Sequence, residues 1–362
     1  MQLVAYGAQD VYLTGNPQIT FWKVVYRRHT NFAMEAVQQT FNGTANLGKK
    51  VTCTVSRNGD LVHKVYLQVV LSAGPDDVGG NPVTRLGHRL IKSVEVEIGG
   101  QQIDKHYGEW MDAWHDLTCP EEKKDGMETM LGSGNSEQTL YIPLQFWFCR
   151  NPGLAVPLIA LQYHEVKINV DFAGSAEVGN DVTSMDDASL WVDYIYLDTD
   201  ERRRFAQVSH EYLIEQLQYT GTETIANGTN KVRMNFNHPV KELVWVLDGT
   251  DANSSMEWKA MDGKVKMLLN GHDRFAERNS DYFSLVQPHQ HHTRVPTAKS
   301  VHCYSFALKP EEHQPSGTCN FSRIDNATLQ LNTTTAGTMR LFAVNYNVLR
   351  VMSGMGGLAY SN

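Results

Sequence analysis

The chain has 362 residues, a hydrophobic content of 41% and a formal net charge of −8. This composition is sufficient for large apolar cores, so it excludes a chain that is disordered throughout, and the length predicts about two domains. The negative charge argues against a dedicated nucleic-acid binder, because such proteins usually carry a basic domain or stripe.

The chain begins with MQLVAYGAQD, in which no basic segment precedes an apolar one, so we expect no signal peptide. No stretch approaches eighteen consecutive apolar residues, which argues against a transmembrane helix. The five cysteines are widely spaced and form no CxxC pair, which favours free thiols over a disulfide framework. These features predict a soluble protein that is made inside the cell.

Residues 15–35, GNPQITFWKVVYRRHTNFAME, combine aromatic and basic side chains. Asn16 can cap a helix that has proline at its first position, and apolar residues then recur at helical spacing. We therefore predict a helix of about three turns in an N-terminal arm, residues 1–30. The residues expected to make assembly contacts in this arm are Pro17, Ile19, Trp22, Val25, Tyr26, Arg27 and Arg28.

Apolar residues alternate with polar ones through much of the remaining chain, and this period of two predicts β-strands. The clearest alternating segments are residues 51–55, 65–71, 94–98, 166–172 and 189–198. Strong helical periodicity is scarce. Short strands separated by Gly, Asn and Pro are typical of β-sandwiches and barrels.

The second half of the chain repeats segments of the first half in the same order. The matched residues are Glu35 with Glu215, Val51 with Val232, Gly100 with Gly271, and Tyr194 with Tyr346. Four weak matches in one order indicate a duplicated domain whose second copy has lost loop residues. A repeat this long indicates two tandem domains, because the repeats of solenoids are only about 20–50 residues long.

We therefore predict an all-β fold of two tandem eight-stranded jelly rolls that follow a short N-terminal arm or helix. The expected boundaries are an arm at 1–30, a first jelly roll at 31–200, a linker at 201–212 and a second jelly roll at 213–362. The linker is charged and lies between the last strand of one copy and the first strand of the next.

A search for catalytic or metal-binding motifs gives no strong candidate. The segment 289–292 contains three histidines but no nearby carboxylate, so we interpret it as a polar loop and not as a metal site. His63, His164 and His302 are scattered over different predicted strands. We therefore expect no catalytic residues, no metal and no cofactor.

Several long blocks of the sequence resemble one protein family, and together they extend from one end of the chain to the other. The blocks are residues 7–35, 56–61, 153–168, 191–207, 210–218, 317–329 and 345–360. They are similar to the double jelly-roll major capsid proteins of large icosahedral nucleocytoplasmic double-stranded DNA viruses. The similarity is strongest to the chlorella-virus type within the phycodnaviruses.

This resemblance implies a structural, non-enzymatic subunit of a virion. In this family three copies form a pseudo-hexagonal trimer, and the trimers tile the capsid faces over an internal membrane. The implied partners are further copies of the chain, neighbouring capsomers, minor capsid proteins beneath the shell and the internal membrane surface, with no direct contact to nucleic acid. The resemblance also implies synthesis and assembly in the host cytoplasm.

The N-terminal arm has no counterpart in the second copy, so it is free to serve assembly. We interpret it as a clasp beneath the shell that binds its own trimer or a minor protein. Contact with the membrane surface is the second interpretation. Direct contact with DNA is the least favoured, because an internal membrane would separate the two.

Five N-x-S/T sequons are candidate glycosylation sites, although a chain rich in Asn and Thr contains a few by chance. They begin at Asn42, Asn227, Asn253, Asn326 and Asn332. We expect Asn253 and Asn332 to lie in outward loops and to carry the sugars. Asn326 is expected at the start of a strand, where it is less accessible.

Two alternatives stay open at the level of sequence. The loops between strands are shorter than in the algal-virus relatives. The first alternative is therefore that the chain is a low-copy capsid paralogue that occupies special shell positions. A jelly roll also supports lectins and cupin enzymes, so a carbohydrate-binding protein or an enzyme is the alternative from a different class.

Overall fold

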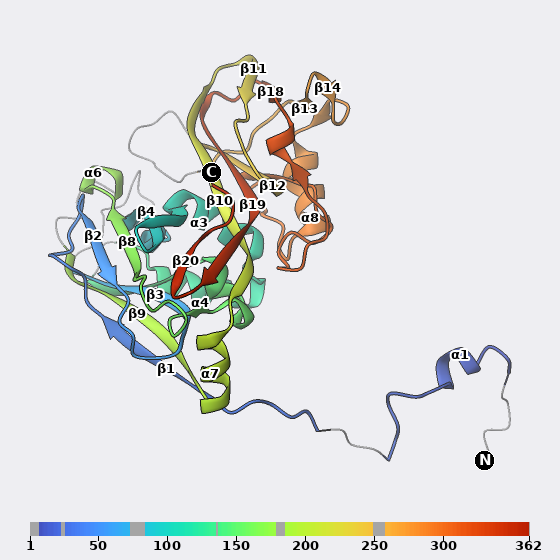
Figure 1. Cartoon of the computed structure of the whole chain (residues 1–362). Coiled ribbons are helices and arrows are strands. Elements are labelled where there is room, and N and C mark those ends of the chain that lie inside the picture. The colour runs from blue at the N-terminus through green and yellow to red at the C-terminus, as the bar shows by residue number, and fades with distance from the viewer. Residues whose placement is uncertain are drawn as a thin grey trace.

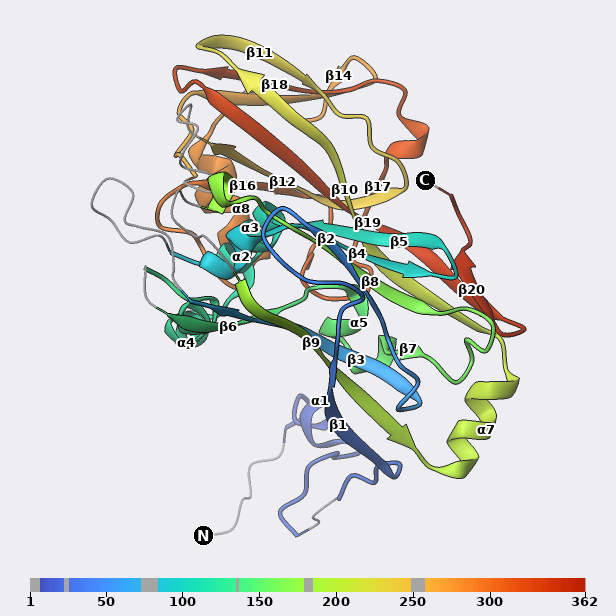
Figure 2. The ribbon, with the colours of Figure 1, turned by 90° about the vertical axis from the view of Figure 1, so that its left-hand side faces the viewer.

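The computed structural model describes residues 7–22, 26–72, 84–134, 137–178, 185–248 and 258–361. Two β-sandwiches lie side by side and account for most of the chain (Figures 1 and 2). Each sandwich consists of two facing antiparallel sheets, which is the double jelly roll predicted from the alternating pattern.

The first sandwich is built from the first half of the chain. One sheet has the order β1 (Phe32–Gln39), β9 (Met185–Leu197), β3 (Leu61–Leu71) and β6 (Gln138–Pro143), with β7 (Val156–Pro157) beside β3. The facing sheet has the order β2 (Lys50–Thr54), β8 (Val166–Phe172), β4 (Ile91–Ile98) and β5 (Gln101–Tyr107).

The second sandwich repeats this arrangement. One sheet has the order β10 (His210–Ile225), β19 (Gly337–Met352), β12 (Pro239–Asp248) and β16 (Val301–Ser305), with β17 (Cys319–Asn320) beside β12 and β20 (Met355–Leu358) beside β19. The facing sheet has the order β11 (Gly228–Arg233), β18 (Ala327–Thr333), β13 (Lys264–Leu269) and β14 (His272–Asp273), with β15 (Arg278–Asn279) beside β13. Strands that come in the same order along each half of the chain therefore occupy equivalent positions in the two sandwiches.

The predicted match of Gly100 with Gly271 marks equivalent tight turns. Gly99 and Gly100 join β4 to β5, and Asn270 and Gly271 join β13 to β14. All four residues have positive φ, as a two-residue hairpin turn of type I′ requires at both central positions. Glycine and asparagine tolerate this conformation better than other residues, which explains the shared sequence signal.

Helices fill the connections between strands and are concentrated in the first half. They are α2 (Leu86–Leu90), α3 (Gly108–Thr118), α4 (Glu121–Leu131), α5 (Trp147–Arg150), α6 (Ser175–Val178), α7 (Thr199–Gln207) and α8 (Gln287–His291). Short helical turns are η1 (Pro152–Leu154), η2 (Tyr282–Val286, a π-helix) and η3 (Phe321–Arg323). Helix α7 occupies most of the segment expected to be a linker, and β10 begins within that segment. No helix in the described part of the chain is long and apolar enough to cross a bilayer.

The sheet β10-β19-β12-β16 is buried on both faces. Leu243 and Leu341 point into the core of the second sandwich. Val244 and Phe342, each one strand position further on, belong to the apolar cluster that also contains the core of the first sandwich. The two jelly rolls are therefore joined by a continuous apolar contact, which a flexible linker alone would not provide.

The N-terminal arm differs from the prediction. The only helical turn among its described residues is α1 (Val11–Thr14), and Asn16, the expected helix cap, has φ of 47°. Ile19, Trp22 and Tyr26 are 84–93% exposed, so the apolar face expected for a helix is not covered by either jelly roll in the described part of the chain. An isolated helix of this length is marginal without such packing, which explains its absence.

Candidate functional site

The junction between the two jelly rolls is formed by three elements of the first and one sheet of the second. Strand β5 and helices α3 and α5 face strands β10 and β19. Trp110 of α3 packs against Phe342 of β19 with ring centroids 5.4 Å apart. Leu217 of β10 donates its backbone N–H to Asp104 of β5 at 3.0 Å. Polar and apolar contacts thus both fix the relative position of the two units.

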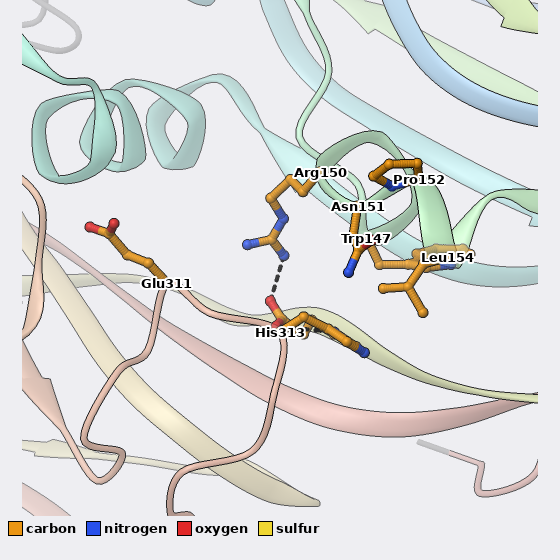
Figure 3. A pocket seen from close by; sticks show the side chains of 8 residues that line it. Trp147, Arg150, Asn151, Pro152, Leu154, Glu311 and His313 are labelled. Atoms are coloured by element: carbon orange, nitrogen blue, oxygen red, sulfur yellow. Dashed lines mark hydrogen bonds and ion pairs between the residues drawn. The ribbon is translucent and has the colours of Figure 1, made fainter. Parts of the chain in front are cut away.

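A buried ion cluster lies at one end of this junction, and two of its members, Arg150 and His313, are labelled in Figure 3. Arg150, the last residue of α5, donates a hydrogen bond of 2.6 Å to Glu215 of β10. Lys241 of β12 lies 2.7 Å from the same carboxylate. His313 approaches it at 3.7 Å. Lys241 is fully buried and Glu215 is 3% exposed. The cluster connects the first jelly roll to two neighbouring strands of the second.

The charge balance of this cluster favours an ionised Glu215. Burial opposes ionisation and raises the pKa, but Arg150, His313 and Lys241 together outweigh it and lower the pKa of Glu215 to about 2. Burial lowers the pKa of Lys241, and Glu215 opposes that effect. Since each charge depends on its partner, loss of one member leaves the others buried without compensation.

A cavity of about 240 Å³ lies beside the cluster and is lined by both jelly rolls. Its walls are Trp147, Arg150, Asn151, Pro152, Leu154, Glu215, Glu311 and His313. In Figure 3, Arg150 points across the cavity towards the second unit, where Glu311 and His313 lie. The volume is below the roughly 300–1,000 Å³ of typical ligand pockets.

A second polar cluster anchors helix α3. Asp112 is buried and accepts a hydrogen bond of 2.7 Å from the indole of Trp258 in the second unit. Arg85 lies 3.0 Å and His88 3.3 Å from the same carboxylate. Burial raises the pKa of Asp112, but Arg85 and His88 outweigh it and lower the pKa to about 2. Asp112 therefore joins the two units as a buried, compensated charge.

The histidine segment 289–292 is not the polar loop that the sequence predicted. It forms the end of α8 and the residue that follows, and His292 is buried. His292 Nε2 lies 3.0 Å from Glu242, and Nδ1 lies 3.0 Å from Glu311. These carboxylates are distant in sequence, so local composition could not reveal them. Within the described residues, no group of three or more His, Cys, Asp or Glu side chains is arranged to hold a metal ion.

The other predicted site residues are dispersed over the surface. Asn42, Asn227 and Asn326 are exposed, with Asn326 directly before β18 as expected. Asn332 is exposed but lies within β18, so its expected place in a loop was wrong. Asn253 lies outside the described residues, as does Val25 of the arm. Glycosylation at these asparagines stays a prediction.

The junction residues were missed by the sequence analysis because no local motif marks them. Arg150 and Glu215 are 65 positions apart, and Asp112 and Trp258 are 146 apart. A charged residue within a mostly apolar strand, such as Lys241 in PVKELVWVLD, is the one available signal. It indicates a buried or interface charge when the strand is apolar on both faces.

Comparison with known protein families shows which proteins share the sequence of this chain. The family described as "Major capsid protein N-terminus" matches residues 20–198, and "Large eukaryotic DNA virus major capsid protein" matches residues 201–357. The chain belongs to the major capsid proteins of large eukaryotic DNA viruses. It is 58% identical to the major capsid protein of Pyramimonas orientalis virus, with 100% of this chain and 99% of that protein covered.

Solved structures agree with this assignment to the major capsid protein family. The structure matches PBCV-1 VP54 with a TM-score of 0.86 and 39% identity, over 95% of this chain and 100% of that chain. The Faustovirus major capsid protein matches with a TM-score of 0.77 at 12% identity, which supports the fold. This major capsid protein is therefore a structural component of a viral capsid and assembles into a shell with other capsid proteins.

The major capsid protein is trimmed relative to its relatives. The alignment to the Paramecium bursaria Chlorella virus 1 protein, at 44% identity, runs over 437 positions, although this chain has 362 residues. The relative therefore carries insertions that this chain lacks. This agrees with the expectation from the sequence that the loops between strands are shorter than in the algal-virus relatives.

Proposed function

We propose that this major capsid protein functions as a homotrimer, and that this trimer is the capsomer of the shell. The carrying observation is that the two jelly rolls have the same strand order and pack side by side. One protomer thus presents two similar units, and three protomers present six around a ring. A closed ring satisfies every interface and leaves no open end.

The finer features of the assembly belong to the same proposal. The capsomers tile the faces of an icosahedral shell above an internal membrane, contact neighbouring capsomers and rest on minor capsid proteins. The chain is made and assembled in the host cytoplasm, performs no catalysis and does not contact DNA directly. We propose 31–200 and 213–362 as its two jelly rolls, joined by the segment 201–212.

The N-terminal arm, residues 1–30, acts in this proposal as a clasp beneath the capsomer. Its exposed aromatic side chains support the role, because Trp22 is 88% and Tyr26 84% exposed. The ring contact of Trp22 is with its exposed neighbour Phe21, which belongs to the same arm. Arg27 and Arg28 extend next to them and suit an acidic protein partner. The membrane surface is the second candidate for this contact.

Electron microscopy of the purified protein tests the trimer. The proposal predicts particles with a hexagonal outline and threefold symmetry, each made of three two-lobed subunits. A field of isolated two-lobed particles at high protein concentration would contradict it. Quantitative mass spectrometry of virions then separates a principal subunit, which we propose, from a low-copy paralogue, because the two differ greatly in copy number.

A further inference from the structure

His115 of helix α3 is buried where the two jelly rolls meet, and its side chain is only 5% exposed. Neither ring nitrogen makes a hydrogen bond to another described residue. The carboxylate of Asp116 is 3.9 Å from Nδ1, which is beyond hydrogen-bond distance. A protonated ring would carry two N–H groups and a positive charge at this place, with no acceptor for either group. The site therefore suits a neutral imidazole and not a charged one.

The groups around His115 that can carry positive charge come from both jelly rolls. Arg85 and His88 belong to the first, at and just after the start of α2, and the His88 ring lies 6.1 Å from the His115 ring. Arg294 belongs to the second and lies three residues after the end of α8. A charge on His115 would thus be added beside existing cations.

The two acidic neighbours of His115 are already paired. Asp112 lies 3.0 Å from Arg85, and Asp116 lies 3.0 Å from Arg85 and 3.9 Å from Arg294. Both carboxylates lie on α3 itself. A proton on His115 would therefore place a further cation in a group whose anions already have partners.

The titration of His115 agrees with this geometry. Burial lowers the pKa of His115 to about 4, the nearby His88, Arg85 and Arg294 lower it as well, and Asp112 opposes them. An exposed histidine has a pKa of about 6.5. An opened junction, in which the ring meets water, thus binds the proton more tightly than the closed one. Closure is therefore weakened as the pH falls from about 6.5 towards 4, and is weakened no further below that.

The main ion pairs of the junction keep their charges over the same range. The pKa values of Asp112 and Glu215 are both about 2, and that of His292 is raised well above 6.5. Asp116 is different, because burial raises the pKa of its carboxyl. Acid therefore charges His115 while the pairs at Asp112 and Glu215 stay intact, and Asp116 needs a control of its own.

Helix α3 contacts the second jelly roll on either side of His115. The backbone N–H of Arg294 donates a hydrogen bond of 3.0 Å to the carbonyl of Leu117. Trp114 meets His292 with ring centroids 6.2 Å apart. Repulsion between a charged His115 and Arg294 acts directly across these contacts.

We propose that His115 is an acid-sensitive element of the junction, whose protonation loosens the contact between helix α3 and residues 292–294 of the second jelly roll. The two jelly rolls then move more freely relative to each other, while both cores stay folded. A capsid built from such subunits is less stable in an acidic compartment than at neutral pH. The element lies within one chain, so it does not depend on the proposed trimer.

Hydrogen exchange measured by mass spectrometry on the full-length protein tests this element. Exchange is compared at pH 7.5 and pH 5.0, after correction for the intrinsic effect of pH on amide exchange. Peptides that cover 110–118 and 292–300 should lose at least about tenfold in protection at pH 5.0, because each unit of pKa difference changes the opening equilibrium tenfold. Peptides from β12 in the core should stay protected. Equal protection of 110–118 at the two pH values would overturn the inference.

Three variants identify the group that titrates. His115→Gln cannot gain a charge and should keep its neutral-pH protection at pH 5.0. His289→Gln changes an exposed histidine and should lose protection as the wild type does. Asp116→Asn cannot take up a proton at that carboxyl and should still respond to acid. A response that persists in His115→Gln, or that disappears in Asp116→Asn, would overturn the assignment to His115.

NMR of the wild-type protein with labelled histidine keeps the test independent of how His115→Gln folds. The His115 ring should be neutral at pH 6 and should titrate with a midpoint of about 4. A midpoint near 6.5, the value of an exposed ring, would overturn the inference.

Discussion

Arg150 of the first jelly roll donates a hydrogen bond of 2.6 Å to Glu215 of the second, and this pair is the central polar contact between the two units. Lys241 approaches the same carboxylate from within the second unit at 2.7 Å. One buried anion thus holds two cations from different jelly rolls. The relative position of the two units, which determines the shape of the subunit, depends on this compensated charge.

The first prediction concerns removal of that anion. Glu215→Gln leaves Arg150 and Lys241 close together without a counter-charge, and breaking a buried pair in this way costs about 3–5 kcal/mol. Glu211→Gln on the same strand is the control, because the Glu211–Arg350 pair at 2.8 Å is largely exposed. Its effect should be below about 1 kcal/mol. Urea denaturation measures both, and equal losses for the two variants would refute the role of the cluster.

The second prediction concerns acid. The pKa of Glu215 is about 2 in the folded chain, below its ordinary value of 4.5. A lowered pKa stabilises the fold above pH 4.5, and this contribution is lost as the pH falls from 4.5 towards 2. The stability difference between wild type and Glu215→Gln should therefore shrink over that range. A difference that stays constant from pH 6 to pH 2 would show that Glu215 does not titrate as described.

The third prediction concerns His292, which lies between Glu242 and Glu311. Burial lowers the pKa of His292, but Glu242 and the other partners outweigh it and raise the pKa well above 6.5. A raised pKa stabilises the fold fully below pH 6.5, and the contribution is lost as the pH rises through the folded value. NMR titration of the imidazole should show a charged ring at neutral pH.

His292 also has a matched control in the same segment. His292→Gln leaves Glu242 buried without its cation and should cost about 3 kcal/mol or more. His289→Gln changes an exposed histidine of α8 and should lie within about 0.5 kcal/mol of wild type. Similar stabilities for the two variants would contradict the buried ion pair.

The fourth prediction concerns the N-terminal arm. The described residues of the arm, 7–22 and 26–30, are almost all exposed and belong to neither core, so after deletion of residues 1–30 trimers should form with unchanged stability. Shell assembly from those trimers should fail or give aberrant particles, as judged by electron microscopy. Normal shells from the deleted protein would rule out the clasp.

Much of the fold could be predicted from the sequence because the strands alternate apolar and polar residues, and this alternation is directly visible. The alternating segments at 51–55, 94–98 and 166–172 correspond closely to β2, β4 and β8. The turn at Gly100 and its match at Gly271 were also readable, since positive φ restricts the choice of residue. Strands and turns that restrict the choice of side chain locally could therefore be predicted correctly.

The junction could not be predicted, and the match of Glu35 with Glu215 shows why. Gln39 bonds to Ser56 in the first unit, and Gln218 bonds to Asn237 at the corresponding place in the second. When the two strands are aligned on these glutamines, Glu35 and Glu215 are one residue out of register. In a strand, a shift of one residue moves a side chain to the opposite face. Glu35 and Glu215 are therefore the same residue type in the sequence match, but only Glu215 faces the neighbouring unit. The sequence match could not show this difference.

The arm shows the opposite limit. Helical spacing of Ile19, Trp22 and Tyr26 was real in the sequence, but spacing specifies a helix only when a surface receives the apolar face. No described residue of either jelly roll provides that surface. The spacing of the arm residues therefore did not predict their conformation in the single chain.

The central claim is that three copies of this chain form the capsomer, and light scattering of the purified protein tests it most directly. One chain has a mass of 40.8 kDa. Our account predicts a particle of roughly 120 kDa that persists on dilution into the low micromolar range, as expected for a closed ring. A particle that keeps the mass of a single chain at every concentration tested would contradict it.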